Sequence, residues 1–169
     1  MVTRKYLILL SLSGFVVALD QLSKNAIVSS FKLGESVHVI PGLFSLSRVH
    51  NTGAAFGLLA TLPANLRDPF FLLVPAVTLS VILGVFYKLK ENQSLNVYAL
   101  SSIVGGALGN IADRVRLGYV VDFLDFHLSF QWHFPAFNVA DSAITLGVFM
   151  LLMGMLFERE DEVPSRMVV

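Results

Sequence analysis

Five aspartates are placed where a carboxyl group can do chemistry at a membrane surface. Asp20, Asp113 and Asp141 each lie near one end of a long apolar stretch, and Asp122 and Asp125 lie between two such stretches. A carboxylate at the centre of a bilayer costs about 2.5–3.5 kcal/mol on insertion scales, so an acid at such a position requires an explanation. Because the chain crosses the membrane back and forth, all five acids come to the same end, whichever way the protein faces.

Polar partners accompany these acids at helical spacing. Asp20 and Lys24 are four residues apart and share one helix face. Two further stretches carry polar residues at i, i+3 or i+4 spacing: Asn110 with Asp113 and Arg114, and Asn138 with Asp141. Small residues in the same stretch as Asp113 allow a neighbouring helix to approach closely: Gly105, Gly106 and Gly109. The pattern predicts a polar cluster held between tightly packed helices.

Two carboxyl groups held close together tend to share one proton, because both cannot ionise cheaply. One of them accepts a proton from water while the other donates a proton to a carbonyl or a leaving amine, as in aspartic proteases. The chain has no cysteine, and it contains no G-x-S-x-G, H-E-x-x-H or Gly-rich phosphate-loop motif. The residue types therefore favour acid–base catalysis by a carboxyl pair.

Structural roles compete with chemical ones for several of these acids. Asp20 with Lys24 is typical of a salt bridge at a helix end. Asp113 with Arg114 is equally consistent with an ion pair that fixes the end of its helix. For Asp141, an acid inside a membrane segment, a functional role is the default hypothesis. Spacing alone does not say which two acids would catalyse.

The residues outside the apolar stretches have plainer interpretations. Asn51 precedes a Thr-Gly pair and is typical of a turn, and Asp122 by itself is an ordinary loop acid. His127 and His133, with Asp125 nearby, raise the question of a metal site. Their spacing suits one face of a strand, and no third ligand is evident, which favours a solvated or interfacial pair over a metal centre.

The elements that must position these residues are membrane helices. Hydrophobic residues make up 55% of the 169 residues and charged residues 14%, against about 25% in a soluble domain. Spanning a bilayer takes about 20 helical residues, and four stretches qualify: residues 6–22, 70–87, 95–112 and 136–157. The first is interpreted as an uncleaved signal anchor. With 12 basic and 12 acidic residues, the chain offers no electrostatic support for a nucleic-acid partner.

The two substantial loops, 23–69 and 115–135, lie on one side of the membrane. Residues 31–50 alternate polar and apolar around Pro41-Gly42, which predicts a small β-hairpin, and residues 62–73 suit a short interfacial helix. The short segments on the other side are dense in Lys and Arg, which places both termini in the cytoplasm. We expect one membrane domain, 1–169: a bundle of four transmembrane helices, with a small β-structured insert at about 28–60 and the interfacial helix on the non-cytoplasmic side.

Five segments spread in order over nearly the whole chain resemble the bacterial signal peptidase II family, the membrane aspartic endopeptidases that process lipoproteins. They are LDQ (19–21) with Lys24, NTGAAFG (51–57), GGALGN (105–110) with Asp113 and Arg114, GYVVDF (118–123) and FNVAD (137–141).

The resemblance implies that Asp122 and Asp141 are the catalytic pair. It also implies a periplasmic β-cradle and a short periplasmic helix around the site, with a set of residues that order the site or hold substrate: Asp20, Lys24, Asn51, Gly106, Asn110, Asp113, Arg114 and Asn138.

The activity implied by the resemblance is removal of signal peptides from prolipoproteins, on the N-terminal side of a diacylglyceryl-modified cysteine. The implied location is the bacterial inner membrane, with the site near the periplasmic face. The implied partners are lipidated precursor proteins, membrane lipid and globomycin-type inhibitors. We expect the protein to be a monomer that uses no cofactor or metal.

Two other classes of function compete with this one. A transporter or proton relay would use Asp20, Asp113 and Asp141 as a carboxylate path, although the acids lie at one depth and not along a path. A metal-dependent membrane hydrolase would use His127 and His133.

Overall fold

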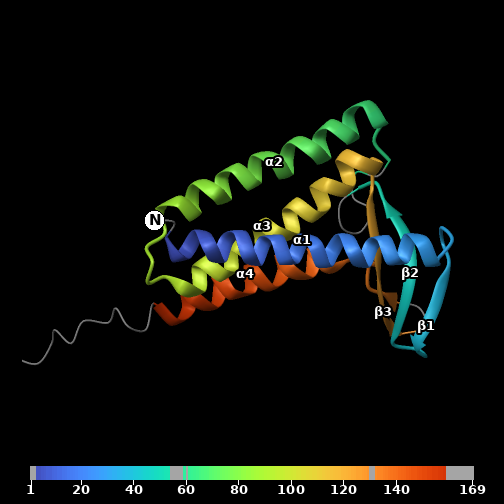
Figure 1. Ribbon diagram of the computed structural model, residues 1–169. Helices are drawn as coiled ribbons and strands as arrows, with labels where there is room; N and C mark the ends of the chain where they lie inside the picture. The colour runs from blue at the N-terminus through green and yellow to red at the C-terminus, as the bar shows by residue number, and fades with distance from the viewer. Residues whose placement is uncertain (1–2, 54–58, 60, 130–131, 159–169) are drawn as a thin grey trace, which may run out of the picture.

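The computed structural model describes residues 3–53, 59, 61–129 and 132–158. Within those residues, four helices are long and apolar enough to cross a membrane. They are α1 (Arg4–Ser30), α2 (Ala64–Lys88), α3 (Ser94–Leu117) and α4 (Val139–Glu158). The helices form a bundle with a β-sheet at one end, and the N-terminus lies at the other end (Figure 1). The predicted four-span architecture is confirmed.

Helix α1 continues well past the predicted end of its span at residue 22. The added turns also pack against the protein, because Lys24 is only 2% exposed and Ile27 only 7%. The helix stops at Phe31, whose backbone is extended. Arg48 closes this end by donating from Nη1 to the carbonyl oxygens of Val28, at 3.1 Å, and Phe31, at 2.9 Å. These carbonyls would otherwise lack a helical partner.

Helix α2 differs from the expectation. Residues 62–73, expected as a short interfacial helix feeding the second span, do lead directly into that span, but as part of one continuous helix from Ala64 to Lys88. Pro63 directly precedes the helix, where its missing N–H costs nothing. Pro69 and Pro75 lie inside it, as membrane helices tolerate. At the far end, Lys5 donates from Nζ to the carbonyl oxygen of Leu89 at 2.7 Å and ties α1 to the end of α2.

Helix α3 is the centre of the bundle and packs against the other three helices. Of its most apolar stretch, 56% is buried, against at most 17% in each of the other helices, which therefore turn most of their surface outward. Glycines make the close packing possible. A Cβ on Gly105 would lie 2.7 Å from the Val16 side chain of α1, and one on Gly106 would meet the Ala140 carbonyl of α4.

Counted over the described residues, the sheet contains four antiparallel strands in the order β1 (Ser36–Ile40), β2 (Phe44–Asn51), β3 (Val120–Ser129) and β4 (Trp132–His133). The predicted hairpin is confirmed, because β1 and β2 pair around a turn in which Gly42 has a φ of 75°. Such a left-handed backbone favours glycine.

Strand β3 lies within residues 115–135, where the sequence pattern predicts a loop. It lies between α3 and α4 in sequence and pairs with β2, with Asn51 opposite Val120 and Val49 opposite Asp122. Asp122 therefore lies on a ten-residue strand and not in a loop. Because β3 follows α3 directly and leads back to α4, it connects the sheet to the end of the bundle where the acids gather.

Candidate active site

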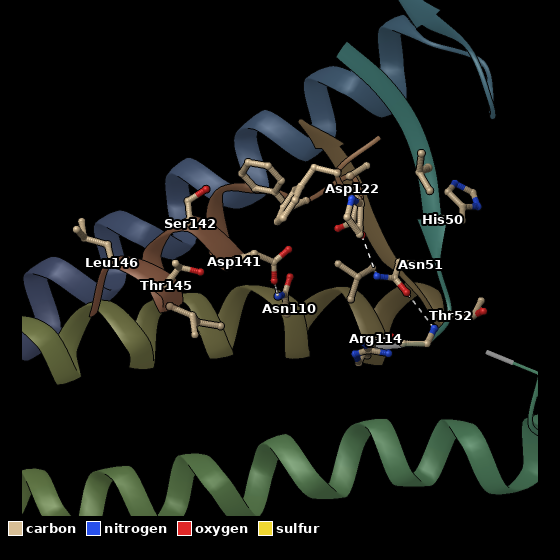
Figure 2. Close-up of a pocket in the computed structure, with 18 of the residues that line it drawn as sticks. His50, Asn51, Thr52, Asn110, Arg114, Asp122, Asp141, Ser142, Thr145 and Leu146 are labelled. Atoms are coloured by element: carbon tan, nitrogen blue, oxygen red, sulfur yellow. Dashed lines mark hydrogen bonds between the residues drawn. The ribbon is translucent and has the colours of Figure 1, made fainter. Parts of the chain in front are cut away.

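A cavity of about 1000 Å³ opens between the sheet and the helices. Its walls come from β2 and the residues after it, from β3, from α3 and from α4. Asp122 and Asp141 both face it (Figure 2). The structure thus brings the two predicted catalytic carboxyl groups, which come from different elements, to one space.

Asp122 is buried, with 2% of its surface exposed. Its Oδ2 accepts a hydrogen bond from Asn51 Nδ2 at 2.9 Å, and its Oδ1 accepts one from Asn138 Nδ2 at 2.7 Å. The pKa of Asp122 is raised to about 7, chiefly by burial and also by the nearby charge of Asp141, while the hydrogen bonds from Asn51 and Asn138 act in the opposite direction. Asp122 is consequently poised to hold or release a proton near neutral pH.

Asp141 lies in the first turn of α4, because the helix begins at Val139 and not at residue 136, where the predicted span begins. Its Oδ1 accepts a hydrogen bond from Asn110 Nδ2 at 2.8 Å, and its Oδ2 accepts one from the backbone N–H of Asn138 at 3.2 Å. Asn138, which is fully buried, therefore contacts both carboxyl groups and sets their relative position.

A buried ion cluster lies directly behind the carboxyl pair. Lys24 Nζ is 2.8 Å from Asp20 Oδ2 and 2.9 Å from Asp113 Oδ2, and it donates to Asn110 Oδ1 at 2.9 Å. The predicted Asp20–Lys24 bridge is present, whereas Asp113 pairs with Lys24 and not with Arg114. Through Asn110, which also bonds Asp141, the buried ammonium is connected to the site.

The ion cluster also holds the backbone next to each candidate catalytic residue. Asp20 Oδ1 accepts the N–H of Ala140, which precedes Asp141, at 3.0 Å. Asp113 Oδ2 accepts the N–H of Val121, which precedes Asp122, at 3.1 Å. Each of these acids therefore fixes the chain one residue away from a cavity carboxyl group.

Gln21 is a site residue that the sequence reasoning did not select. Its Nε2 lies 2.8 Å from Asp113 Oδ1 and 3.2 Å from Asp20 Oδ2, and it also reaches the carbonyl oxygen of Gly109 at 3.2 Å. In the sequence, Gln21 is marked by its place beside Asp20 in the LDQ segment, but an amide adjacent to a buried acid has no helical spacing that identifies it as a partner.

Asn51 and Arg114 organise the chain that follows β2. Asn51 Oδ1 accepts the N–H of Gly53 at 3.0 Å, so the expected turn is present, and the same side chain also serves Asp122. Arg114 donates from Nη2 to the Gly53 carbonyl at 3.0 Å, and its guanidinium lies 4.7 Å from the ring centre of Phe71. Arg114 therefore links α3, α2 and the mouth of the cavity.

His38 and His127 lie apart from this site. His127 Nε2 and His38 Nδ1 each lie 2.8 Å from the hydroxyl oxygen of the buried Ser45. The His133 side chain lies outside the described side chains. Among the described residues, no group of three His, Asp or Glu side chains is arranged to hold a metal ion.

Comparison with known proteins shows to which family the chain belongs. Residues 12–157 match the family model described as signal peptidase (SPase) II. The chain belongs to the signal peptidase II family. It is 48% identical over 149 residues to a lipoprotein signal peptidase of Syntrophotalea carbinolica, and this match covers 88% of the chain and 91% of the relative. A lipoprotein signal peptidase of Geobacter sulfurreducens is 48% identical over 148 residues, which is 88% of the chain and 91% of that relative.

A solved structure of a bacterial membrane enzyme superposes with a TM-score of 0.81 at 32% identity, covering 95% of this chain and 94% of that one. A second bacterial membrane enzyme gives a TM-score of 0.76 at 34% identity, covering 88% of this chain and 92% of that one. The chain is thus a multi-pass membrane protein with the fold of a membrane peptidase family.

Proposed function

We propose that the protein is an aspartic endopeptidase that removes signal peptides from prolipoproteins, cutting on the N-terminal side of a diacylglyceryl-modified cysteine. The observation that carries the proposal is the placement of Asp122 and Asp141 on one cavity, with Asn138 hydrogen-bonded to both. The pKa of about 7 for Asp122 supports it, because a carboxyl group with that pKa is still partly protonated at neutral pH.

Asp122 is the proton donor in this proposal and Asp141 is the base. Asp141 takes a proton from water as the water oxygen attacks the peptide carbonyl carbon, and Asp122 gives its proton to the carbonyl oxygen. Asp141 then returns its proton to the leaving nitrogen as the C–N bond breaks. Asp122 recovers a proton from a hydroxyl of the intermediate, and the pair is restored. Asp141 suits the ionised role because the first turn of a helix stabilises negative charge.

The shape of the cavity suits a substrate anchored in lipid. From the two carboxyl groups the wall continues along one face of α4 through Thr145 to Phe149, eight residues beyond Asp141, or about 12 Å at the rise of an α-helix. Burial of acyl chains in the bilayer supplies about 0.8 kcal/mol per CH₂ and would hold the modified cysteine at this depth. Non-lipidated precursors are therefore expected to be poor substrates.

We further propose that both termini lie in the cytoplasm of a bacterial inner-membrane enzyme, so that the sheet and the cavity lie near the periplasmic face. The protein would act as a monomer without a cofactor, and globomycin-type inhibitors would occupy the cavity. The remaining predicted site residues, Asp20, Lys24, Gly106, Asn110, Asp113 and Arg114, would order the site, as their contacts indicate.

The decisive experiment uses the purified full-length protein in lipid nanodiscs and a diacylglyceryl-modified precursor, with products identified by mass spectrometry. Asp122→Asn and Asp141→Asn are expected to lose at least about 10³-fold in cleavage rate while they remain folded, since each removes an acid–base group. Asp125→Asn is the matched control, because Asp125 lies on the same strand but outside the cavity.

Normal processing by both cavity variants would show that the carboxyl pair is assigned wrongly. Equal rates for the lipidated and bare precursors would refute the anchoring argument. Failure of globomycin to inhibit the wild-type protein would separate this cavity from the inhibitor site.

A further inference from the structure

Strand β2 borders the cavity in a different way from its neighbour β3. The cavity is lined by five consecutive residues, Val49 to Gly53, but from β3 only by the alternate residues Val120 and Asp122. Successive side chains of a strand point to opposite faces. The cavity therefore passes over one face of β3, whereas it reaches the backbone of β2 along its edge.

The pairing of β2 with the β1 side ends at Arg48. The N–H of Arg48 donates to the carbonyl of Glu35 at 2.9 Å, and its carbonyl accepts from the N–H of Gly34 at 2.9 Å. In an antiparallel sheet both backbone groups of one residue point to the same side, and the side alternates along the strand. His50, two residues after Arg48, therefore points its N–H and C=O toward the same outer edge.

The residue opposite His50 on β3 confirms this direction. Val121 faces His50 in the register, yet its N–H donates to Asp113 Oδ2 at 3.1 Å and its carbonyl accepts from Asn138 Nδ2 at 3.4 Å. Both backbone groups of Val121 thus point away from β2. His50 and Val121 form a non-hydrogen-bonded pair, which leaves the backbone groups of His50 to the outer edge of the sheet.

No other described residue pairs with the backbone of His50 on that edge. The His50 ring stacks on Tyr119 at 3.8 Å between ring centres and lies on the side of β2 away from Asp122 (Figure 2). Within the part of the chain that the structure describes, His50 therefore has a backbone donor and acceptor without a partner where β2 borders the cavity, one residue before the Asn51 that donates to Asp122.

We propose that the backbone of His50 binds the peptide substrate as an added strand. A residue of the extended substrate chain exchanges two hydrogen bonds with His50, donating its N–H to the His50 carbonyl and accepting from the His50 N–H. This inference rests on the proposed function. Strand addition at a sheet edge gives affinity through the main chain, whatever the flanking side chains are.

The spacing of the sheet gives the register of the bound peptide. Strands lie about 4.8 Å apart, so a strand added outside β2 runs about 10 Å from β3, which carries Asp122. The peptide must cross the face of β2 to bring the cleaved bond between the carboxyl groups. At about 3.3 Å per residue, the substrate residue paired with His50 lies two to four residues from the cleaved bond.

The test is an amide-to-ester scan of a lipidated peptide substrate, assayed with the wild-type full-length protein in nanodiscs. Each ester removes one N–H, and the cleaved bond itself is left as an amide. One ester, two to four residues from the cleaved bond, is expected to lower kcat/KM by about 2- to 12-fold, the loss of one hydrogen bond. An ester at the residue just before it leaves both paired backbone groups unchanged, so it is the matched control and should change kcat/KM by less than about 2-fold.

A second measurement uses the uncleaved complex. Asp122→Asn protein, shown to be folded, is mixed with substrate carrying one ¹³C=O label at a time, and isotope-edited infrared spectra are recorded. The carbonyl at the position found by the ester scan should shift to the lower frequency of a β-paired amide, relative to peptide in empty nanodiscs.

A flat ester scan, or labelled carbonyls identical in the presence and absence of protein, would overturn strand addition while leaving cleavage intact. Wild-type protein that cuts no lipidated peptide would instead overturn the proposed function.

Discussion

Asn138 and Asp141 form a reciprocal pair across the first turn of α4. The backbone N–H of Asp141 donates to Asn138 Oδ1 at 2.9 Å, and the backbone N–H of Asn138 donates to Asp141 Oδ2 at 3.2 Å. This is a capping box, which satisfies two otherwise unpaired donors at a helix N-terminus. The remaining amide group of Asn138 bonds Asp122, so the start of α4 and the geometry of the carboxyl pair depend on one side chain.

The two roles of Asn138 can be separated by mutation. Asn138→Ser keeps an oxygen that can cap the helix but loses the amide that donates to Asp122, whereas Asn138→Ala loses both. The Ser variant is expected to be about 1 kcal/mol more stable than the Ala variant, because a cap of this type contributes about that much. Both variants should lose activity to a similar extent. Reversible unfolding in detergent, followed by a cleavage assay, measures both quantities, and equal unfolding free energies would contradict the capping role.

Activity should depend on pH through Asp122. Its pKa of about 7 means that it holds a proton below that pH and loses it above. If the protonated form is the donor, kcat/KM falls about tenfold per pH unit on the alkaline side, beyond about pH 7. Asn51→Ala removes a hydrogen bond that stabilises the ionised form, so the alkaline limb should move to higher pH. A profile that is flat from pH 5 to 9, or that is unchanged in Asn51→Ala, would exclude Asp122 as the titrating group.

Gly106 and Gly84 form a matched pair for testing helix packing at the site. A methyl group on Gly106 would meet the Ala140 carbonyl and lie 2.7 Å from Ile144, so α4 and with it Asp141 must shift. Gly106→Ala is expected to cost about 1–3 kcal/mol and most of the activity. A methyl group on Gly84 of α2 meets nothing within 4 Å, and Gly84→Ala should be neutral or slightly stabilising. Similar unfolding free energies for the two variants would show that α3 and α4 do not need this close contact.

Lys24 should be the most sensitive of the lysines to neutralisation. Its ammonium, 2.8 Å from Asp20 and 2.9 Å from Asp113, compensates two buried carboxylates. Lys24→Met is expected to destabilise the protein by about 3–5 kcal/mol, the cost of leaving buried charge unpaired. Lys88→Met, at an exposed helix end, should change stability by less than about 1 kcal/mol. Thermal unfolding in the same detergent compares the variants, and a small effect at Lys24 would mean that the cluster is solvated.

The gathering of the acids at one end could be predicted because it depends only on the direction in which each helix runs. Asp20, Asp113 and Asp141 lie together for that reason, and the helical spacing of Lys24 and Asn110 correctly assigned them to the same cluster. Partners without such spacing were not predictable. Gln21 bonds Asp113 across two helices, and only packing decides that contact.

Strand β3 was not predicted from the sequence, for a different reason. Val120 to Phe123 are all buried, Asp122 included, so the segment lacks the alternation of exposed and buried residues that marks a half-buried strand. Its partner β2 lies about 70 residues away in sequence, and such long-range pairing has no local signal. The expected interfacial helix at residues 62–73 merged into α2 because Pro69 and Pro75 do not break a helix in this setting.

The wall of the cavity changes in character along α4. It begins with Asp141 and Ser142, continues past Thr145 and ends with Leu146 and Phe149. This change from polar to apolar residues forms a polarity gradient. A molecule with one polar and one apolar segment has one favourable orientation in it, with the polar segment at the carboxyl groups and the apolar segment toward the middle of the bilayer. Selection by such a gradient depends on where polarity changes along a molecule and not on its individual side chains, so it would add to the proposed recognition of the modified cysteine without requiring one fixed apolar sequence.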